Sequence, residues 1–174
     1  ALIGNTYQAE KNKYLESIIE ALRRRNVEVV VERKFLHFIT QVLNIECSGM
    51  VAFDETDFSA DLCISIGGDG TFLQAAAYVG NKSIPIIGIN TGHLGCLADV
   101  PPNLIEEAFH SLWNGEYIVE RRSVIEVRLN GELFTKYPYA LNEVAVLKHD
   151  NSSLIAIVAH IDGGLLNHYM AVGP

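Results

Sequence analysis

The first two-thirds of the chain alternates short apolar runs with stretches in which apolar residues recur at helical spacing, and this alternation restricts the fold. Repeated strand-then-helix units are typical of a parallel β-sheet that is covered on both faces. The predicted strands are Ala1–Gly4, Val27–Val31, Leu62–Ile66 and Ile84–Ile89. The predicted helices are Lys11–Arg25, Arg33–Leu43, Thr71–Tyr78 and Asn103–Asn114. We therefore predict an α/β domain over residues 1–115.

The pattern changes after Gly115 to that of antiparallel β-structure. Two dipeptides, Asn130-Gly131 and Asp162-Gly163, are strong signals for two-residue hairpin turns. The strands predicted around them are Ser123–Leu129, Glu132–Tyr137, Ala140–Leu147 and Leu154–Ile161. We place a domain boundary near residue 116 and predict a partial β-rich domain over residues 116–174, which is short for an independent β-domain.

Charge and composition argue against several classes of protein. The formal net charge is -8 and the pI is about 5.2, so no basic face for nucleic acid is expected. No apolar stretch approaches the ~20 residues of a transmembrane helix, and no signal peptide is visible, so we predict a cytoplasmic protein without membrane contact. The three cysteines lack CxxC spacing, which predicts neither a disulfide framework nor a zinc site.

The segment Gly67–Thr71 follows a predicted buried strand and precedes a predicted helix. Its glycines allow positive φ and a close approach of backbone N–H groups to a phosphate. Asp69 would repel phosphate, so it suits a group that takes a proton from an attacking hydroxyl or holds Mg²⁺. Both roles indicate phosphoryl transfer. The alternative is an ordinary turn in which Asp69 caps the following helix.

Two further segments carry polar residues beside apolar strands. Gly88–Asp99 contains Asn90, which can donate hydrogen bonds to a ligand, although an ordinary strand-to-helix loop explains it as well. The pair Asn142 and Glu143 lies inside an apolar run, where polar side chains need partners. A solvated pair at the start of a strand is the alternative there.

Together, the three segments resemble the NAD kinase family. The family pattern is a Gly-Gly-Asp-Gly-Thr turn, a Gly-Ile-Asn-x-Gly-x-Leu-Gly-Phe-Leu loop, and Leu-Asn-Glu-x in a second domain. This chain has them in order as Gly67–Thr71, Gly88–Leu97 and Leu141–Glu143. The resemblance implies a Rossmann-like parallel-sheet domain followed by part of an antiparallel, sandwich-like β-domain.

The resemblance also implies an activity and a set of site residues. The activity is phosphoryl transfer from ATP, or polyphosphate, with Mg²⁺, to the adenosine-ribose 2′-hydroxyl of NAD, giving NADP. Asp69 matches the catalytic aspartate, and the family assembles as homo-oligomers such as dimers or tetramers. The implied nucleotide-binding residues are Gly67, Gly68, Asp69, Gly70, Thr71, Phe72, Asn90, Cys96, Asn142 and Glu143. No residue is predicted as a dedicated metal ligand.

Two departures from the family pattern leave alternatives open. Cys96 stands where the family usually has Phe, and a thiol offers much less contact area. The family also continues with a Thr-Pro-Thr-Gly-Ser-Thr-Ala-Tyr loop that these residues lack, which suggests a C-terminally incomplete chain. The alternatives are a lipid kinase of the diacylglycerol or sphingosine type, and a nucleotide-binding module without turnover.

Overall fold

The computed structural model describes residues 1–7, 12–92, 95–147 and 154–172. Contacts divide the chain into two compact units, Ala1–Leu141 and Asn142–Pro174. Residues 116–141 belong to the first unit, and within it Lys136 and Tyr137 both bind the Glu55 carboxylate. This division is based on contacts, whereas the boundary near residue 116 rests on a change of strand pattern. That boundary stays a prediction.

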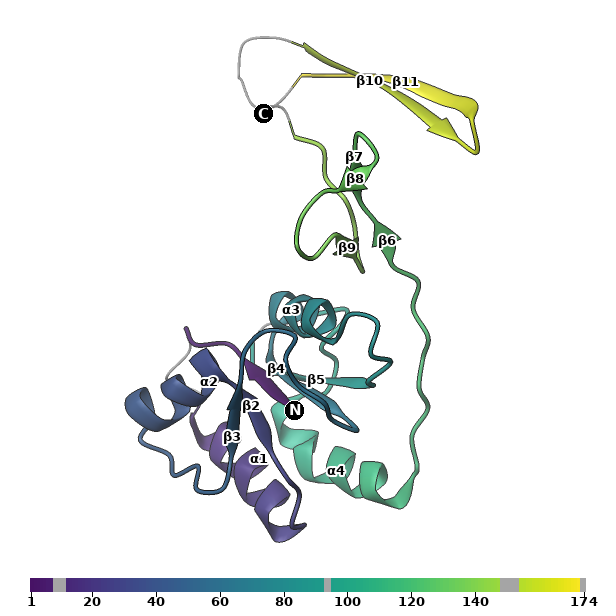
Figure 1. The fold of residues 1–174 in the computed structure, drawn as a ribbon. Helices are drawn as coiled ribbons and strands as arrows, with labels where there is room; N and C mark the ends of the chain where they lie inside the picture. The colour runs from purple at the N-terminus through teal and green to yellow at the C-terminus, as the bar shows by residue number, and fades with distance from the viewer. Residues whose placement is uncertain (8–11, 93–94, 148–153, 173–174) are drawn as a thin grey trace. The chain divides into compact units, whose positions relative to one another are not determined.

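A five-stranded parallel sheet forms the centre of the first unit, with the order β3-β2-β1-β4-β5 (Figure 1). The chain runs outward from β1 to β3 and then returns to the other side of β1 with β4 and β5. The strand order therefore reverses between β1 and β4, and ligands of such sheets bind at this point, beyond the carboxyl ends of the strands. The strands are β1 (Leu2–Gly4), β2 (Val30–Glu32), β3 (Val51–Phe53), β4 (Cys63–Gly67) and β5 (Ile86–Asn90).

Helices cover both faces of the sheet, with α1 and α4 on one side and α3 on the other (Figure 1). Alternate side chains of each strand point to opposite faces. Accordingly, Leu2 and Ile64 are buried with α1 and α4, whereas Ile3 and Cys63 are buried with α3. The helices of this unit are α1 (Asn12–Arg24), α2 (Arg33–His37), the π-helix η2 (Phe38–Val42), α3 (Asp69–Val79), the 3₁₀-helix η3 (Pro102–Leu104) and α4 (Ile105–Asn114). The predicted α/β fold is confirmed.

Several predicted boundaries in the α/β part are corrected. The second strand begins at Val30 rather than Val27, and β3 was not predicted at all. The predicted helix Arg33–Leu43 is an α-helical turn followed by the π-helix η2. The buried Glu32 carboxylate starts α2 by accepting a hydrogen bond of 2.8 Å from the N–H of Phe35. Gly115 ends α4 at φ 74°, as its position in the sequence predicts.

Antiparallel strand pairs follow, and both predicted hairpin turns are confirmed. Asn130 and Gly131 have φ values of 53° and 87°, and Asp162 and Gly163 have 49° and 80°, so both residues of each turn are left-handed. The strands are β6 (Ile125–Glu126), β7 (Arg128–Leu129), β8 (Glu132–Leu133), β9 (Tyr139–Ala140), β10 (Leu154–Ile161) and β11 (Gly164–Val172).

The predicted strand Ala140–Leu147 is wrong beyond its first residue. Only Tyr139–Ala140 pairs, with β6, and residues 141–147 are irregular. The side chains of Val144 and Val146 in this segment are exposed. An alternating apolar pattern forms a strand only where a partner strand and a packing surface are available.

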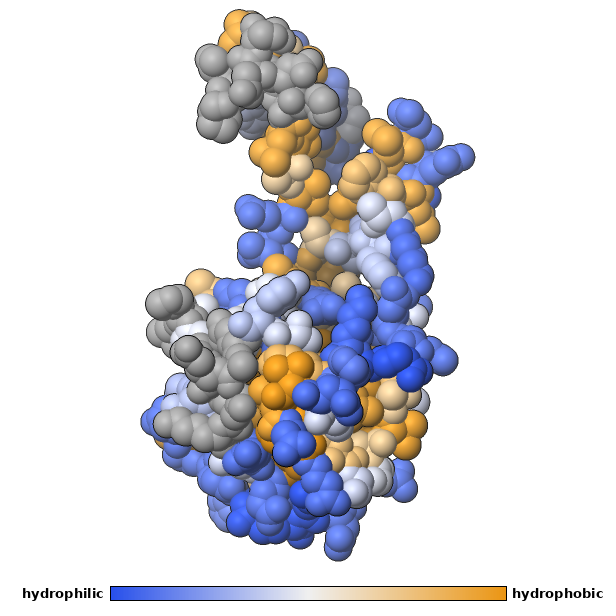
Figure 2. Space-filling view, turned by 90° about the vertical axis from the view of Figure 1, so that its left-hand side faces the viewer, coloured by the Kyte–Doolittle hydropathy of each residue, from blue (hydrophilic) through white to orange (hydrophobic). Residues whose placement is uncertain are grey.

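The surface combines hydrophilic and apolar regions (Figure 2). Large apolar side chains are often exposed in the β-rich segments, for example Phe134 and Met170.

Among the described residues, no helix has the length and hydropathy needed to span a bilayer.

Candidate active site

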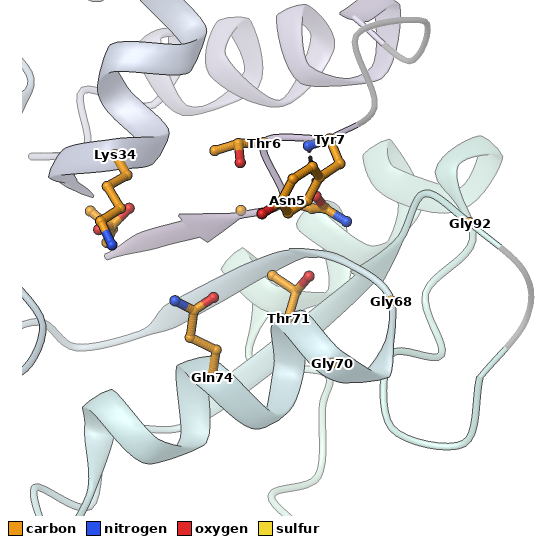
Figure 3. A pocket seen from close by; sticks show the side chains of 11 residues that line it. Asn5, Thr6, Tyr7, Lys34, Gly68, Gly70, Thr71, Gln74 and Gly92 are labelled. Atoms are coloured by element: carbon orange, nitrogen blue, oxygen red, sulfur yellow. Dashed lines mark hydrogen bonds between the residues drawn. The ribbon is translucent and has the colours of Figure 1, made fainter. Parts of the chain in front are cut away.

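A pocket of about 520 Å³ opens at the point where the strand order reverses (Figure 3). It lies beyond the carboxyl ends of β1 and β4, where the loop after β1 meets the glycine turn and the start of α3. The residues that line it are Gly4, Asn5, Thr6, Tyr7, Glu32, Lys34, Gly68, Gly70, Thr71, Gln74 and Gly92. Of the predicted site residues, this pocket brings together Gly68, Gly70 and Thr71.

The glycine turn differs from its expected backbone conformation. Gly68 is the N-cap of α3 at φ −105° and ψ −167°, and its carbonyl accepts hydrogen bonds from Thr71 and Phe72 at 3.0 and 3.1 Å. Among the described residues, no glycine of this turn has positive φ. The expectation of positive φ is therefore wrong, because the strand passes directly into the helix without a left-handed residue.

Close approach, rather than unusual torsion angles, explains the glycines. A Cβ at Gly67 would lie 2.8 Å from the Cβ of Thr71, so this position must stay small. A Cβ at Gly68 or Gly70 would meet nothing within 4 Å, so the backbone there is open toward the pocket. The first N–H groups of a helix lack intrahelical partners, which makes this end of α3 suitable for an anion.

Thr71 gives independent support for a ligand at this helix end. Its residue is only 8% exposed, it lines the pocket, and its hydroxyl has no hydrogen-bond partner among the described residues. Figure 3 shows the Thr71 side chain pointing into the pocket. The hydroxyl oxygen itself is accessible from the pocket, so it can donate to, and accept from, a ligand or water there.

Asp69 contacts the loop that follows β5. Its Oδ2 accepts a hydrogen bond of 2.9 Å from the N–H of Cys96, and its Oδ1 accepts bonds of 3.0 and 3.1 Å from Leu97 and Ala98. Its side chain does not cap α3, so the capping interpretation is wrong. The proton-acceptor role predicted for Asp69 stays a proposal.

The three bonds leave limited capacity on the Asp69 carboxylate. A carboxylate offers about four acceptor sites on its two oxygens, so about one remains, on Oδ2. The N–H groups of Ala98, Cys96 and Leu97 also lower the pKa of Asp69 below its ordinary 3.8, because they stabilise the ionised form. Asp69 is thus ionised at neutral pH and has room for one more hydrogen-bond donor.

A pH dependence of stability follows from this contact. Because the pKa of Asp69 is lower in the folded protein than in the unfolded chain, its contribution to stability is present above pH 3.8 and is lost as pH falls below that value. We expect the stability difference between wild type and Asp69→Asn to be constant near neutral pH and to shrink in acid. Denaturant titrations from pH 7 to pH 3 measure it, and a difference that grows in acid would contradict the assigned contact.

Asn90 is buried and its side chain forms hydrogen bonds with the backbone of the same loop. Its Nδ2 donates to the carbonyl of Ala98 at 3.0 Å, and its Oδ1 accepts from the N–H of Gly92 at 2.8 Å. The side chain is 3% exposed. Asn90 and Asp69 therefore hold Ala98 from opposite sides, one at its carbonyl and one at its N–H. Residues 93 and 94 of this loop lie outside the described residues.

The remaining predicted site residues are placed differently. Phe72 is half-buried and packs over Gly88, where a Cβ would lie 2.8 Å from its ring. Cys96 is exposed and contributes its N–H to Asp69. Asn142 and Glu143 are exposed and belong to the second compact unit. Their roles as nucleotide ligands stay proposals.

Sequence reasoning missed most of the residues that line the pocket. Asn5, Glu32, Lys34 and Gln74 come from segments without a recognisable motif. The signal available in the sequence was indirect. Asn5 directly follows β1 and Glu32 ends β2. The carboxyl ends of parallel strands meet at one edge of the sheet, where the glycine turn also lies.

Comparison with known proteins gives a consistent family assignment. The sequence profile of the ATP-NAD kinase N-terminal domain matches residues 1–117. An NAD kinase of Bacteroides fragilis is 46% identical over 173 residues, covering 99% of this chain and 60% of that protein. One of Cytophaga hutchinsonii is 34% identical over 175 residues, with the same coverage of 99% and 60%. The chain thus spans about 60% of the length of these curated relatives.

A solved structure agrees with the fold. The crystal structure of an NAD kinase from Archaeoglobus fulgidus in complex with ATP superposes with a TM-score of 0.55 and 25% identity, covering 83% of this chain and 57% of that chain. The glycine turn, the parallel sheet and the profile match over most of the chain lead to one conclusion. This chain belongs to the ATP-NAD kinase family.

Proposed function

We propose that this protein transfers the terminal phosphoryl group of ATP to the adenosine-ribose 2′-hydroxyl of NAD, giving NADP and ADP. The observation that carries the proposal is the Asp69 carboxylate, fixed at the N-terminus of α3 directly between Gly68 and Gly70, whose backbone is open to the pocket. The hydroxyl oxygen bonds to the γ-phosphorus, its proton passes to the Asp69 carboxylate, the bond from that phosphorus to the bridging oxygen breaks, and ADP leaves. The family match favours NAD over a lipid as the acceptor.

The contacts of Asp69 support a specific catalytic role for its carboxylate. Its free acceptor site on Oδ2 can orient the 2′-hydroxyl, and its low pKa means that the proton moves late, when the phosphoryl group has largely transferred. Most of the rate enhancement then comes from positioning and electrostatic stabilisation. Asn142 and Glu143 are proposed dinucleotide ligands, and polyphosphate is the alternative donor. Asn90, Phe72 and Cys96 would act chiefly by shaping the loop beside Asp69.

The donor phosphates are proposed to lie against Gly68, Gly70 and the N-terminus of α3. The positive end of the helix dipole and the open N–H groups favour an anion there. Lys34 reaches the same pocket from α2 and supplies a cation, which is needed in a chain with a net charge of -8 (Figure 3). The described residues contain no cluster of three metal-ligating side chains, so Mg²⁺ is proposed to arrive as part of the ATP complex.

Lys34→Met is expected to weaken the binding of the donor ATP selectively. Loss of one charge contact to phosphate should raise the KM for ATP about tenfold, because a hydrogen bond to a charged group contributes roughly 1.5–3 kcal/mol. The KM for NAD should change little. Arg33→Met is the matched control, since Arg33 is adjacent, carries the same charge and pairs with Asp54 at 2.8 Å outside the pocket. Equal KM changes for ATP in the two variants would refute a specific role for Lys34.

One assay tests the function as a whole. The protein is incubated with NAD, ATP and Mg²⁺, and NADP is measured. NADP formation is the expected result, whereas binding of NAD without turnover would support a nucleotide-binding module. A cytoplasmic location and assembly into dimers or tetramers are further proposals that rest on the family resemblance.

A further inference from the structure

Gln74 occupies a distinctive place on α3. Thr71, Gln74 and Tyr78 follow one another at spacings of three and four residues, so they share one face of the helix. Thr71 and Gln74 line the pocket, and Figure 3 shows both side chains extending into the space that Lys34 reaches from the opposite side. This polar helix face therefore begins at the N-terminal end of α3, and the proposed function assigns no role to Gln74 on it.

Contacts beyond the pocket hold Gln74 in position. Its Nε2 donates a hydrogen bond of 3.1 Å to the hydroxyl of Tyr78, and the ring of Tyr78 lies 5.9 Å from that of Tyr137. The Tyr137 hydroxyl in turn donates to Glu55 at 2.6 Å. These contacts fix one amide N–H of Gln74. Its carbonyl oxygen has no partner among the described residues and stays available in the pocket.

The spacing along α3 identifies which part of a ligand Gln74 meets. Gln74 lies four residues after Gly70, which is roughly 6 Å along the helix axis. If phosphates bind at Gly68 and Gly70, this separation matches the step from the phosphates to the sugar of the same nucleotide. An amide that can both donate and accept suits a ribose hydroxyl or the polar edge of a base, and it suits a phosphate chain poorly.

We propose that Gln74 binds the nucleoside of the phosphoryl donor, and that Tyr78 orients Gln74 for this contact. The inference rests on the proposed function, in that it takes the donor phosphates to lie at the N-terminus of α3. Gln74 then discriminates between a nucleoside triphosphate and a phosphate chain that lacks a nucleoside. Tyr78 acts only through Gln74 and is a positioning residue.

Binding measurements with two donors test this assignment. Calorimetric titrations with ATP, with inorganic tripolyphosphate and with NAD are performed on wild type, Gln74→Ala and Tyr78→Phe. Gln74→Ala should weaken ATP binding about fivefold, the value of one hydrogen bond, and leave tripolyphosphate binding unchanged. Tyr78→Phe removes the hydroxyl that accepts from Gln74 but keeps the aromatic contact with Tyr137. It should therefore weaken ATP binding by a smaller factor than Gln74→Ala does, and leave tripolyphosphate binding unchanged. Gln41→Ala, at an exposed glutamine outside the pocket lining, is the control.

Three results would overturn the inference. The first is equal weakening of ATP binding and tripolyphosphate binding in Gln74→Ala. The second is an effect of Gln74→Ala on NAD binding instead of ATP binding. The third is a loss of ATP binding of the same size in Gln41→Ala. The test is separable from the proposed function, because it needs no turnover. A selective loss of ATP binding without any NADP formation would support the role of Gln74 while the kinase activity fails.

Discussion

Asp69→Asn is expected to lower the rate of NADP formation by about 10²–10⁴-fold, the range that a positioned acid or base contributes. An amide can keep its oxygen toward the N–H groups of Leu97 and Ala98, but its NH₂ group then faces the N–H of Cys96. The substitution therefore removes the negative charge, one loop contact and the remaining acceptor site on Oδ2. The KM for ATP should change much less than kcat.

The effect on catalysis must be separated from the effect on the loop. The matched control is Asp99→Asn, the same chemical change at an exposed residue next to the loop. Initial rates of NADP formation are measured beside thermal unfolding for wild type and both variants. A rate in Asp69→Asn within a few-fold of wild type would show that Asp69 serves only to hold the loop.

The sequence predicted those parts of the fold that depend on local patterns. The hairpin at Asn130-Gly131 forms because both turn residues adopt left-handed torsion angles at low cost. The strand at Cys63–Gly67 forms because a short apolar run is buried on both faces. In contrast, β3 has three residues and no periodicity, and it is a strand because β2 offers it a parallel partner.

Contacts distant in sequence explain what could not be predicted at the site. The motif indicated that Asp69 is important, but its partners Cys96, Leu97 and Ala98 lie 27 to 29 residues further along the chain. No local pattern encodes that contact. Likewise, Gln74 has the sequence context of an ordinary helical residue, and only the reversal of strand order beside α3 brings it to the pocket.

Gly95→Ala is expected to damage the site without touching a ligand. A Cβ at this position would lie 2.5 Å from Cγ of Asp69 and would overlap its Oδ1. The carboxylate cannot move aside freely, because three backbone N–H groups hold it. Overpacking of this kind costs about 1–3 kcal/mol, and a protein of this size loses roughly 2–4 °C in Tm for each kcal/mol. NADP formation should fall at least as far as in Asp69→Asn.

Gly70→Ala is the control for the stability effect, since an added Cβ there meets nothing within 4 Å and Gly70 lies inside α3. It should leave Tm unchanged or raise it slightly, because Ala has a higher helix propensity than Gly.

The decisive measurement is a double-mutant cycle with Asp69→Ala, which removes the group that the new methyl would strike. The cost of Gly95→Ala in free energy of unfolding should largely disappear in the Asp69→Ala background, because residues in direct contact do not behave additively. An equal cost in both backgrounds would mean that Gly95 is required for a reason other than the Asp69 carboxylate. A vanishing cost would instead establish that Gly95 is small so that Asp69 can bind the loop.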